Sequence, residues 1–156
     1  MILEDLGPKH KLFEDMEVGD YLFEVGKPND WLSTFADKMD EEATMTYINW
    51  MLRVIEPEEQ AGRVFFHRTM YSASPEKIAQ AKKPYDPAGF TYQFFASIGT
   101  AITQSGEAIV LDEYLTDGLV DLDKMVEVRF WGSLGEVADR KDPSIKRVQL
   151  TKCWSE

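Results

Sequence analysis

The stretch TMTYINWMLRVI, residues 44–55, decides the fold class of this chain. It is rich in the β-branched and aromatic residues that favour strands, and it ends at the turn-forming sequence Glu56-Pro57-Glu58-Glu59. A second run of the same kind, residues 63–70, follows Gln60-Ala61-Gly62. Two such runs joined by a short turn that contains glycine predict a β-hairpin.

Side chains on a strand alternate between its two faces, which divides residues 44–55 into two sets. One set is Met45, Tyr47, Asn49, Met51, Arg53 and Ile55, and the other is Thr44, Thr46, Ile48, Trp50, Leu52 and Val54. On the following strand, Val64, Phe66 and Arg68 alternate with Arg63, Phe65 and His67.

Towards the N-terminus, a shorter strand is predicted at residues 20–25, between a glycine and the turn formers that follow it. Residues 31–42 have apolar residues at helical spacing but also fit a strand before an acidic turn, and both interpretations stay open. Residues 1–19 show no clear period and are predicted to form an N-terminal arm.

Towards the C-terminus, the hydrophobic period changes to that of a helix. Ser74 before Pro75 is typical of a helix start, and the helix is expected to continue to Lys83. A second, amphipathic helix begins near Phe90, and Gly99 is a candidate end for it. These residues predict a helical insertion at about residues 74–105.

The last third of the chain returns to strand patterns. Residues 121–126 lead into a predicted strand at 127–137, which pairs with 145–154 across a turn at 139–143. The fold class is therefore mainly β (α+β), with a single domain at residues 20–156. Five strands with a helical insertion between the third and fourth predict a Greek-key barrel of the OB type, which is partly open.

The composition narrows the class of protein. The chain has 156 residues, enough for one domain with one core, and no run of about 18 apolar residues that would cross a membrane. Cys153 is the only cysteine, and His10 and His67 are the only histidines, so a disulfide within the chain is excluded and a zinc site has too few ligands. We expect a cytoplasmic protein without a cofactor. Cys153 is either a small residue at a strand end or a reactive thiol.

No known catalytic motif is present. The sequence lacks a Walker loop, a dinucleotide-binding glycine pattern, a nucleophile elbow and a metalloprotease helix, so we expect no enzymatic activity. His67 lies among strand aromatics, which favours a structural residue over a general base. The acidic segments at 37–42 and 121–123 are interpreted as solvated turns rather than divalent-cation sites because they lack calcium-loop spacing.

The net charge of −11 is unevenly distributed. Residues 1–60 contain 15 acidic and 5 basic residues, a net of −10, whereas residues 61–156 contain 13 and 12, a net of −1. Within the second part, residues 140–152 carry five basic residues and one acidic residue. Such a local basic segment is able to hold a phosphate backbone even on an acidic protein.

A protein that binds single strands needs cations for phosphates and flat side chains for bases. The predicted strands and the last turn supply both kinds, which makes the following residues candidates for nucleic-acid binding: Trp50, Arg53, Arg63, Phe65, Arg68, Arg129, Trp131, Arg140, Lys141, Lys146, Arg147 and Lys152. His67 and Tyr71 lie on the same strands. Because strands alternate, Trp50 and Arg53 face opposite sides, so these residues cannot all serve one groove.

Four stretches follow the pattern of a known family. They are GDYLF (19–23), the hairpin LRVIE (52–56) with AGRVF (61–65), the helix FFASIG (94–99) and LDKMVEVRFWG (122–132). In these stretches the chain resembles an uncharacterised family of bacteriophage and prophage proteins that are similar to single-stranded-DNA-binding OB-fold proteins. The chain has Glu127 where that family usually has glycine.

The resemblance implies a protein of phage DNA replication or recombination in the cytoplasm of a bacterial host cell. It would bind single-stranded DNA by base stacking and phosphate contacts, with little sequence preference. The charge distribution leaves an alternative, in which residues 1–60 form an acidic protein-interaction module that engages a basic replication or recombination protein, or mimics DNA. A homo-oligomer is compatible with both functions.

Overall fold

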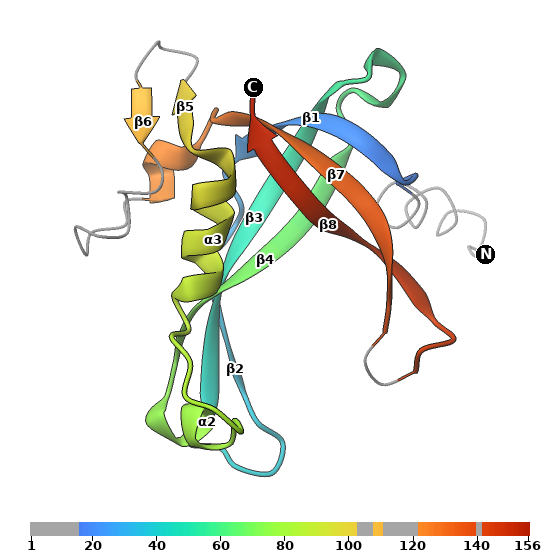
Figure 1. Cartoon of the computed structure of the whole chain (residues 1–156). Coiled ribbons are helices and arrows are strands. Elements are labelled where there is room, and N and C mark those ends of the chain that lie inside the picture. The colour runs from blue at the N-terminus through green and yellow to red at the C-terminus, as the bar shows by residue number, and fades with distance from the viewer. Residues whose placement is uncertain (1–15, 103–107, 111–121, 140–141) are drawn as a thin grey trace, which may run out of the picture.

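The computed structural model describes residues 16–102, 108–110, 122–139 and 142–156, and its main element is an antiparallel six-stranded sheet (Figure 1). The elements in chain order are β1 (Gly19–Gly26), β2 (Leu32–Ala36), β3 (Thr44–Glu56), η1 (Glu58–Gln60), β4 (Val64–Ala73), α2 (Pro75–Ala79), α3 (Gly89–Ile98), β5 (Thr100–Ile102), β6 (Ala108–Val110), η2 (Leu122–Met125), β7 (Arg129–Ala138) and β8 (Lys146–Ser155). The mainly β fold class is confirmed.

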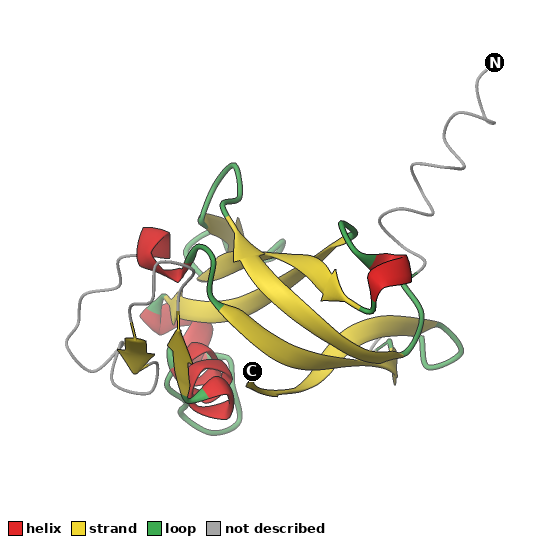
Figure 2. Ribbon diagram, turned by 90° about the horizontal axis from the view of Figure 1, so that it is seen from above, coloured by secondary structure: helices red, strands yellow, loops and turns green. Residues whose placement is uncertain are grey.

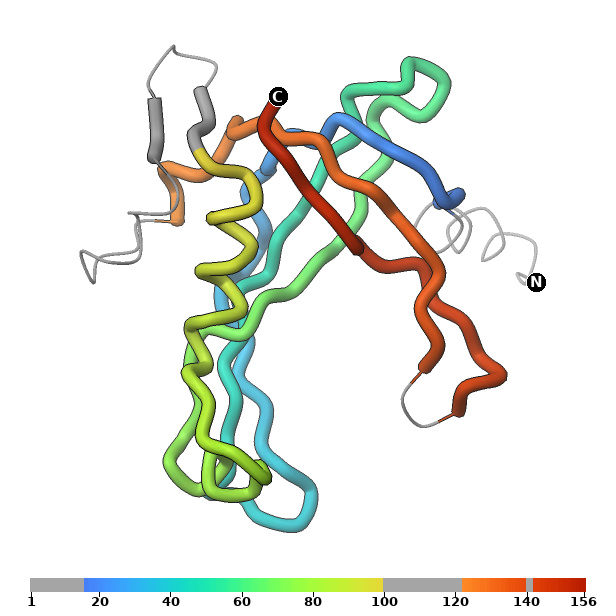
Figure 3. Tube along the Cα trace, viewed as in Figure 1, coloured from blue at the N-terminus to red at the C-terminus, as the bar shows by residue number. Residues whose placement is uncertain are grey.

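β3 organises the sheet because it pairs along both edges. One edge pairs with β4, and the other pairs first with β2, through residues 44–48, and then with β1, through residues 51–56. β1 also pairs with β7, which pairs with β8, so that both predicted hairpins are confirmed. Figure 3 shows β1 in blue between β3 and β7. By pairing with both, β1 places the strands of the N-terminal and C-terminal halves of the chain in one sheet.

The sheet is strongly curved (Figure 2) but is not closed in the described part of the chain. β4 pairs only with β3, and β8 pairs only with β7. α3 packs against both β4 and β8 at one end of the sheet (Figure 1). Elsewhere β4 and β8 stay apart, and a cleft opens between them.

The helical segment begins where the sequence predicts. The Ser74 hydroxyl accepts a hydrogen bond from the backbone N–H of Lys77, and Pro75 occupies the first turn of α2. α2 ends at Ala79, earlier than the predicted Lys83. α3 ends before Gly99, whose φ of 78° lies in the region that favours glycine.

The core lies on the inner face of the curved sheet. Ile48, Trp50 and Leu52 are fully buried, as their shared position in the alternation of β3 requires. Phe95 of α3 and Phe130 of β7 are also fully buried and belong to the same cluster. Burial of this face is the main source of stability, since apolar area removed from water contributes roughly 25 cal/mol per Å².

A buried hydrogen-bonded group ties three elements together inside this core. The indole Nε1 of Trp50 in β3 donates to Thr69 Oγ1 of β4 over 2.8 Å. Thr69 Oγ1 also lies 2.8 Å from the hydroxyl of Thr91 in α3. These polar atoms are therefore satisfied despite burial, as packed interiors require.

The structure decides one segment that the sequence left open and differs from the prediction in two others. One of these is Thr100–Ile102, which forms the strand β5 inside the predicted helical insertion. Leu32–Ala36 forms β2, a sixth strand where five were expected, because β1 covers only half of the long β3 and leaves the backbone groups of residues 44–48 to pair elsewhere. Leu122–Met125 forms the 3₁₀ helix η2 instead of a lead into a strand. The strand starts only after Glu127, where the chain turns with a φ of 76°. The prediction for residues 1–15 lies outside the described residues.

Candidate nucleic-acid interface

The opening between β4 and β8 forms a cleft of about 1200 Å³. Residues 65–68 of β4 form one wall, and residues 145–150 in and before β8 form the other. The rest of the lining comes from Met16, from residues 28–30 and 33, and from Asn49 of β3. The cleft exists because β4 and β8, two edge strands of the curved sheet, approach each other without pairing in the described part of the chain.

Arg68 is held in the cleft by two side-chain contacts. Its Nε donates to Asn49 Oδ1 over 3.1 Å, and its guanidinium carbon lies 5.1 Å from the centre of the Phe35 ring. Asn49 is itself fixed, since its amide donates to the Asp30 carbonyl over 3.0 Å and to Ser33 Oγ over 2.8 Å. The strand-to-strand pairing of Asn49 with Arg68 thus holds a guanidinium in place at the surface.

Lys146 and Arg147 bring positive charge to the opposite wall. Both are exposed, and Arg147 Nε lies 3.5 Å from Asp139 Oδ1. Together with Arg68 they give the lining three cations, against the single carboxylate of Asp30. The cleft is consequently positive on a protein whose net charge is −11.

The aromatic side chains of the cleft differ in exposure. Phe66 points outward and is 56% exposed, whereas Phe65 packs against the core 6.4 Å from the Phe23 ring centre. The ring centre of His67 lies 5.3 Å from that of Phe94, and burial lowers the pKa of His67 to about 4. His67 is therefore neutral at pH 7 and adds no charge, in agreement with the structural role predicted for it.

The structure gathers only some of the predicted binding residues in this cleft, namely Phe65, Arg68, Lys146 and Arg147. Arg63 lies beside the β3–β4 turn, where it donates to Gln60 Oε1 over 2.8 Å. Arg140 and Lys141 lie outside the described residues.

Trp50 needs a correction as a stacking residue. Its side chain is 0% exposed, because it belongs to the inward set of β3, and its ring packs against Phe94 and Phe95. A base has no access to such a ring.

The other predicted residues lie on the outer face of the sheet, away from the core. Arg53 of β3 and Arg129 of β7 are both register partners of Glu24, and Arg129 forms an ion pair with it at 3.1 Å. Trp131 and Lys152 lie on the outer face of the β7–β8 hairpin. These residues are separate from the walls of the cleft.

Three residues of the site were missing from the predicted set: Phe66, Asn49 and Phe35. A signal for two of them was present, since alternation places Phe66 and Arg68 on the same face of one strand. Asn49 sits on the outward face of β3, opposite Arg68 in the pairing register. Phe35 was not assignable, because its segment fitted both a helix and a strand.

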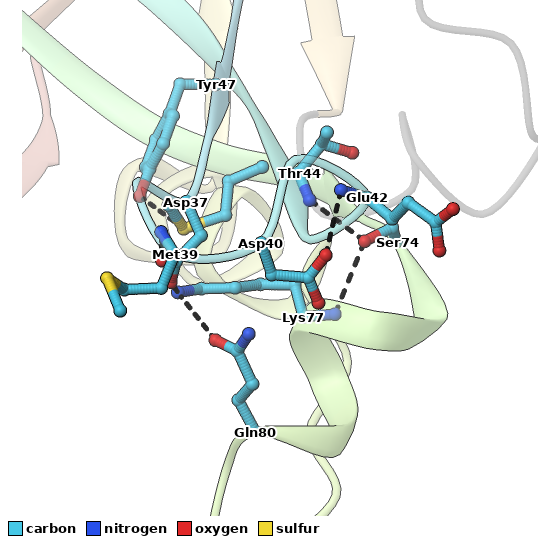
Figure 4. A network of polar contacts seen from close by, with 10 residues as sticks. Asp37, Met39, Asp40, Glu42, Thr44, Tyr47, Ser74, Lys77 and Gln80 are labelled. Atoms are coloured by element: carbon cyan, nitrogen blue, oxygen red, sulfur yellow. Dashed lines mark hydrogen bonds and ion pairs between the residues drawn. The ribbon is translucent and has the colours of Figure 1, made fainter.

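The acidic segment at residues 37–42 is a turn, as predicted (Figure 4). Asp37 accepts a hydrogen bond from the backbone N–H of Met39 and forms an ion pair with Lys77 of α2 at 3.3 Å. These two contacts hold the pKa of Asp37 below its usual value. Asp40 likewise accepts from the backbone N–H of Glu42. The carboxylates therefore shape the turn and tie it to the helix.

The second acidic segment is described only in part. Asp123 Oδ1 accepts a hydrogen bond from Trp31 Nε1 over 2.9 Å and lies 3.6 Å from Lys27 Nζ. This carboxylate connects η2 to the loop between β1 and β2. No group of three or more histidine, cysteine, aspartate or glutamate side chains arranged to hold a metal ion occurs among the residues that the structure describes.

Cys153 packs against the core with a half-buried thiol that lies 4.0 Å from the Phe94 carbonyl oxygen. Burial raises its pKa above the usual value. A raised pKa disfavours the thiolate, which is the reactive form, so the structure favours the packing role over the reactive one.

Comparisons with protein-family models, with curated proteins and with solved structures find no match to this chain. In the described part of the chain, no helix has the length and apolar character needed to cross a membrane. The function is therefore argued from the cleft itself.

Proposed function

We propose that this protein binds single-stranded DNA in the cleft between β4 and β8. The observation that carries the proposal is the position of Arg68 on one wall and of Lys146 and Arg147 on the other, with the exposed ring of Phe66 beside them. Cations on both sides of a groove are suited to following a phosphate backbone, and an exposed ring is suited to stacking a base.

The order of strand pairing supports an OB-type barrel as the fold behind this function. In such barrels the face of the second and third strands binds oligonucleotides. If β1 and β2 together are taken as the first strand, the second and third strands are β3 and β4, which carry Asn49, Phe66 and Arg68. α2 and α3 then correspond to the helical insertion between strands three and four.

Base stacking and phosphate contacts make different contributions to the affinity for DNA and to its salt dependence. Stacking of a base on an aromatic ring contributes about 1–3 kcal/mol, and it is tolerant of sequence. Each phosphate contact made by a cation adds about −0.7 to the slope of log affinity against log salt for a single strand. The three cations of the cleft therefore predict a slope of about −2.

The test is a fluorescence-polarisation titration of a labelled thymidine oligonucleotide at low salt. The double variant Lys146→Ala/Arg147→Ala removes one wall of charge, and we expect its affinity to fall by about tenfold or more. The matched control is Lys82→Ala/Lys83→Ala, which removes the same charge from exposed residues between α2 and α3 and should bind within about twofold of the unmodified protein.

The same titration separates this function from the alternative. Absence of binding at micromolar protein, with the fold intact by circular dichroism, would rule out the DNA-binding proposal and favour the acidic protein-interaction module. Equal losses in the two double variants would also count against the cleft, because they would reflect net charge alone. A role in phage replication or recombination remains a prediction from the resemblance.

A further inference from the structure

The outer face of the β7–β8 hairpin carries a pair of tryptophans that the cleft does not use. Trp131 of β7 and Trp154 of β8 are register partners, with ring centres 6.5 Å apart and ring planes within 9° of parallel. Both rings are half-buried. Lys152 Nζ lies 5.8 Å from the centre of the Trp154 ring, so a cation stands over one of the two indoles.

The outer side of β8 connects this pair to the cleft. Val148, Leu150 and Cys153 pack against the core, so the residues between them point the other way. The outward residues are Arg147, Gln149, Lys152 and Trp154, with a register shift between them that corresponds to a bulge. Arg147 and Gln149 also line the cleft. Trp154 lies seven residues beyond Arg147, which corresponds to about 23 Å along an extended strand.

The charge along this path favours a polyanion. β8 contains three basic residues and no acidic residue. On the neighbouring strand, the outward partners of this stripe are neutral: Val137, Gly135 and Ser133. Asp139 lies 3.5 Å from Arg147 Nε at one end of this stripe. Other carboxylates lie one strand further on, in β1, where Glu24 is paired with Arg129 and Asp20 is the register partner of Ser133.

We propose that the bound single strand leaves the cleft along the outer face of β8 and reaches a second stacking site at Trp131 and Trp154. This inference rests on the proposed function. A nucleic acid fits this face better than a protein does, because lysine is depleted at the centres of protein interfaces, whereas here Lys152 lies directly over an indole. A path lined by cations that leads to aromatic rings on which bases can stack is the usual arrangement for single-strand binding.

The test compares two thymidine oligonucleotides of about 6 and about 20 nucleotides, which lie near the lower end and above the upper end of the usual site sizes of such domains. The short one fills the cleft, and the long one extends to the tryptophans. In Trp154→Ala and in Lys152→Ala we expect the affinity for the long oligonucleotide to fall by about fivefold or more. The affinity for the short one should stay within about twofold of the unmodified protein.

One control variant and a comparison of the two test variants make the outcome unambiguous. Tyr92→Ala removes an exposed aromatic residue of α3 that lies on neither surface and should leave both affinities unchanged. Lys152→Ala keeps both tryptophans, so it tests the site even if Trp154→Ala loses stability. In the unmodified protein, the long oligonucleotide should quench more tryptophan fluorescence than the short one.

The failures of the two proposals are distinguishable. If neither oligonucleotide binds, the proposed function fails and this inference fails with it. If both bind and the two variants weaken neither, the cleft stands as the whole site and the second stacking site is wrong. If Trp154→Ala changes sedimentation behaviour but not affinity for the long oligonucleotide, the face is a contact between copies of the chain, which also overturns the inference.

Discussion

Trp50 and Trp154 lie on strands of the same sheet, with their side chains on opposite faces. Trp50 is 0% exposed and packs between β3, β4 and α3, with its N–H bonded to Thr69. Trp154 is half-buried on the outer face and touches a partner ring and Lys152. The inner face thus uses aromatic residues to hold the fold, while the outer face leaves them partly exposed, where we propose that a single strand stacks.

The largest expected effect is the difference in folding stability between variants at these two tryptophans. Trp50→Ala removes a buried ring and leaves a cavity, so we expect the free energy of unfolding to fall by about 3–5 kcal/mol. Trp154→Ala loses one stacked pair at the surface and should cost about 1 kcal/mol. Urea denaturation followed by circular dichroism measures both. Comparable losses would contradict the division of the sheet into a structural and a binding face.

Two Thr→Val substitutions compare a buried with an exposed hydrogen bond while the shape of the side chain stays the same. Thr69→Val keeps the volume of the side chain but removes the acceptor of the Trp50 N–H, which should cost about 1–3 kcal/mol. The matched control is Thr46→Val, whose hydroxyl lies 2.9 Å from that of Thr34 at an exposed position, where water can take its place as a partner of Thr34. We expect this control to cost about 0.5 kcal/mol or less in the same denaturation experiment. Equal costs would show that burial does not decide the value of these bonds.

His67 lies where the inner face meets the cleft, and it makes the comparison sensitive to pH. Its folded-state pKa of about 4 is below the ordinary 6.5, so the unfolded chain binds more protons between these values. The free energy of unfolding should therefore fall as the pH drops through this window, by at most about 1.4 kcal/mol per pH unit.

The stability contributed by neutral His67 is fully present above pH 6.5. Denaturation of the unmodified protein and of His67→Leu at a series of pH values isolates this residue, since all other groups are shared. The difference between the two proteins should change with pH only in that window. A constant difference would mean that His67 titrates normally and is not buried against Phe94.

The smallest effect belongs to neither face. Glu127 adopts a φ of 76°, in the region that favours glycine. Glu127→Gly should stabilise the fold by about 0.5 kcal/mol, a rise in Tm of about 1–2 °C by calorimetry. Glu127→Ala, which removes the charge but keeps the Cβ atom, should bring no gain. A gain from alanine would assign the effect to charge instead of to the backbone.

Much of the fold was predictable because it rests on local signals. The alternation of residues 44–55 identified β3 and divided its side chains into two sets, one of which forms the core. The helix start at Ser74 followed from capping chemistry, and the two hairpins followed from short turns between strand-like runs. Each of these features depends on neighbours within a few residues, so no tertiary information was needed.

The candidate site was only partly predictable, since its residues meet through long-range pairing. Arg68 and Arg147 are far apart in the sequence and line one cleft only because the curved sheet brings β4 opposite β8. Phe35 supports Arg68 only because β2 pairs beyond β1 on the same edge of β3. Periodicity says which residues share a face, but not which faces meet.

The sequence alone determined five of the six strands of the main sheet, the start of the helical segment and the separation of an acidic N-terminal part from a nearly neutral remainder. The tertiary structure decided which aromatic residues are core and which are surface, as the opposite placement of Trp50 and Trp131 illustrates. It also decided that the positive charges of β4 and β8 share one opening. The physical reason is that alternation is a property of a single strand, whereas burial and charge convergence depend on what the rest of the chain packs against it.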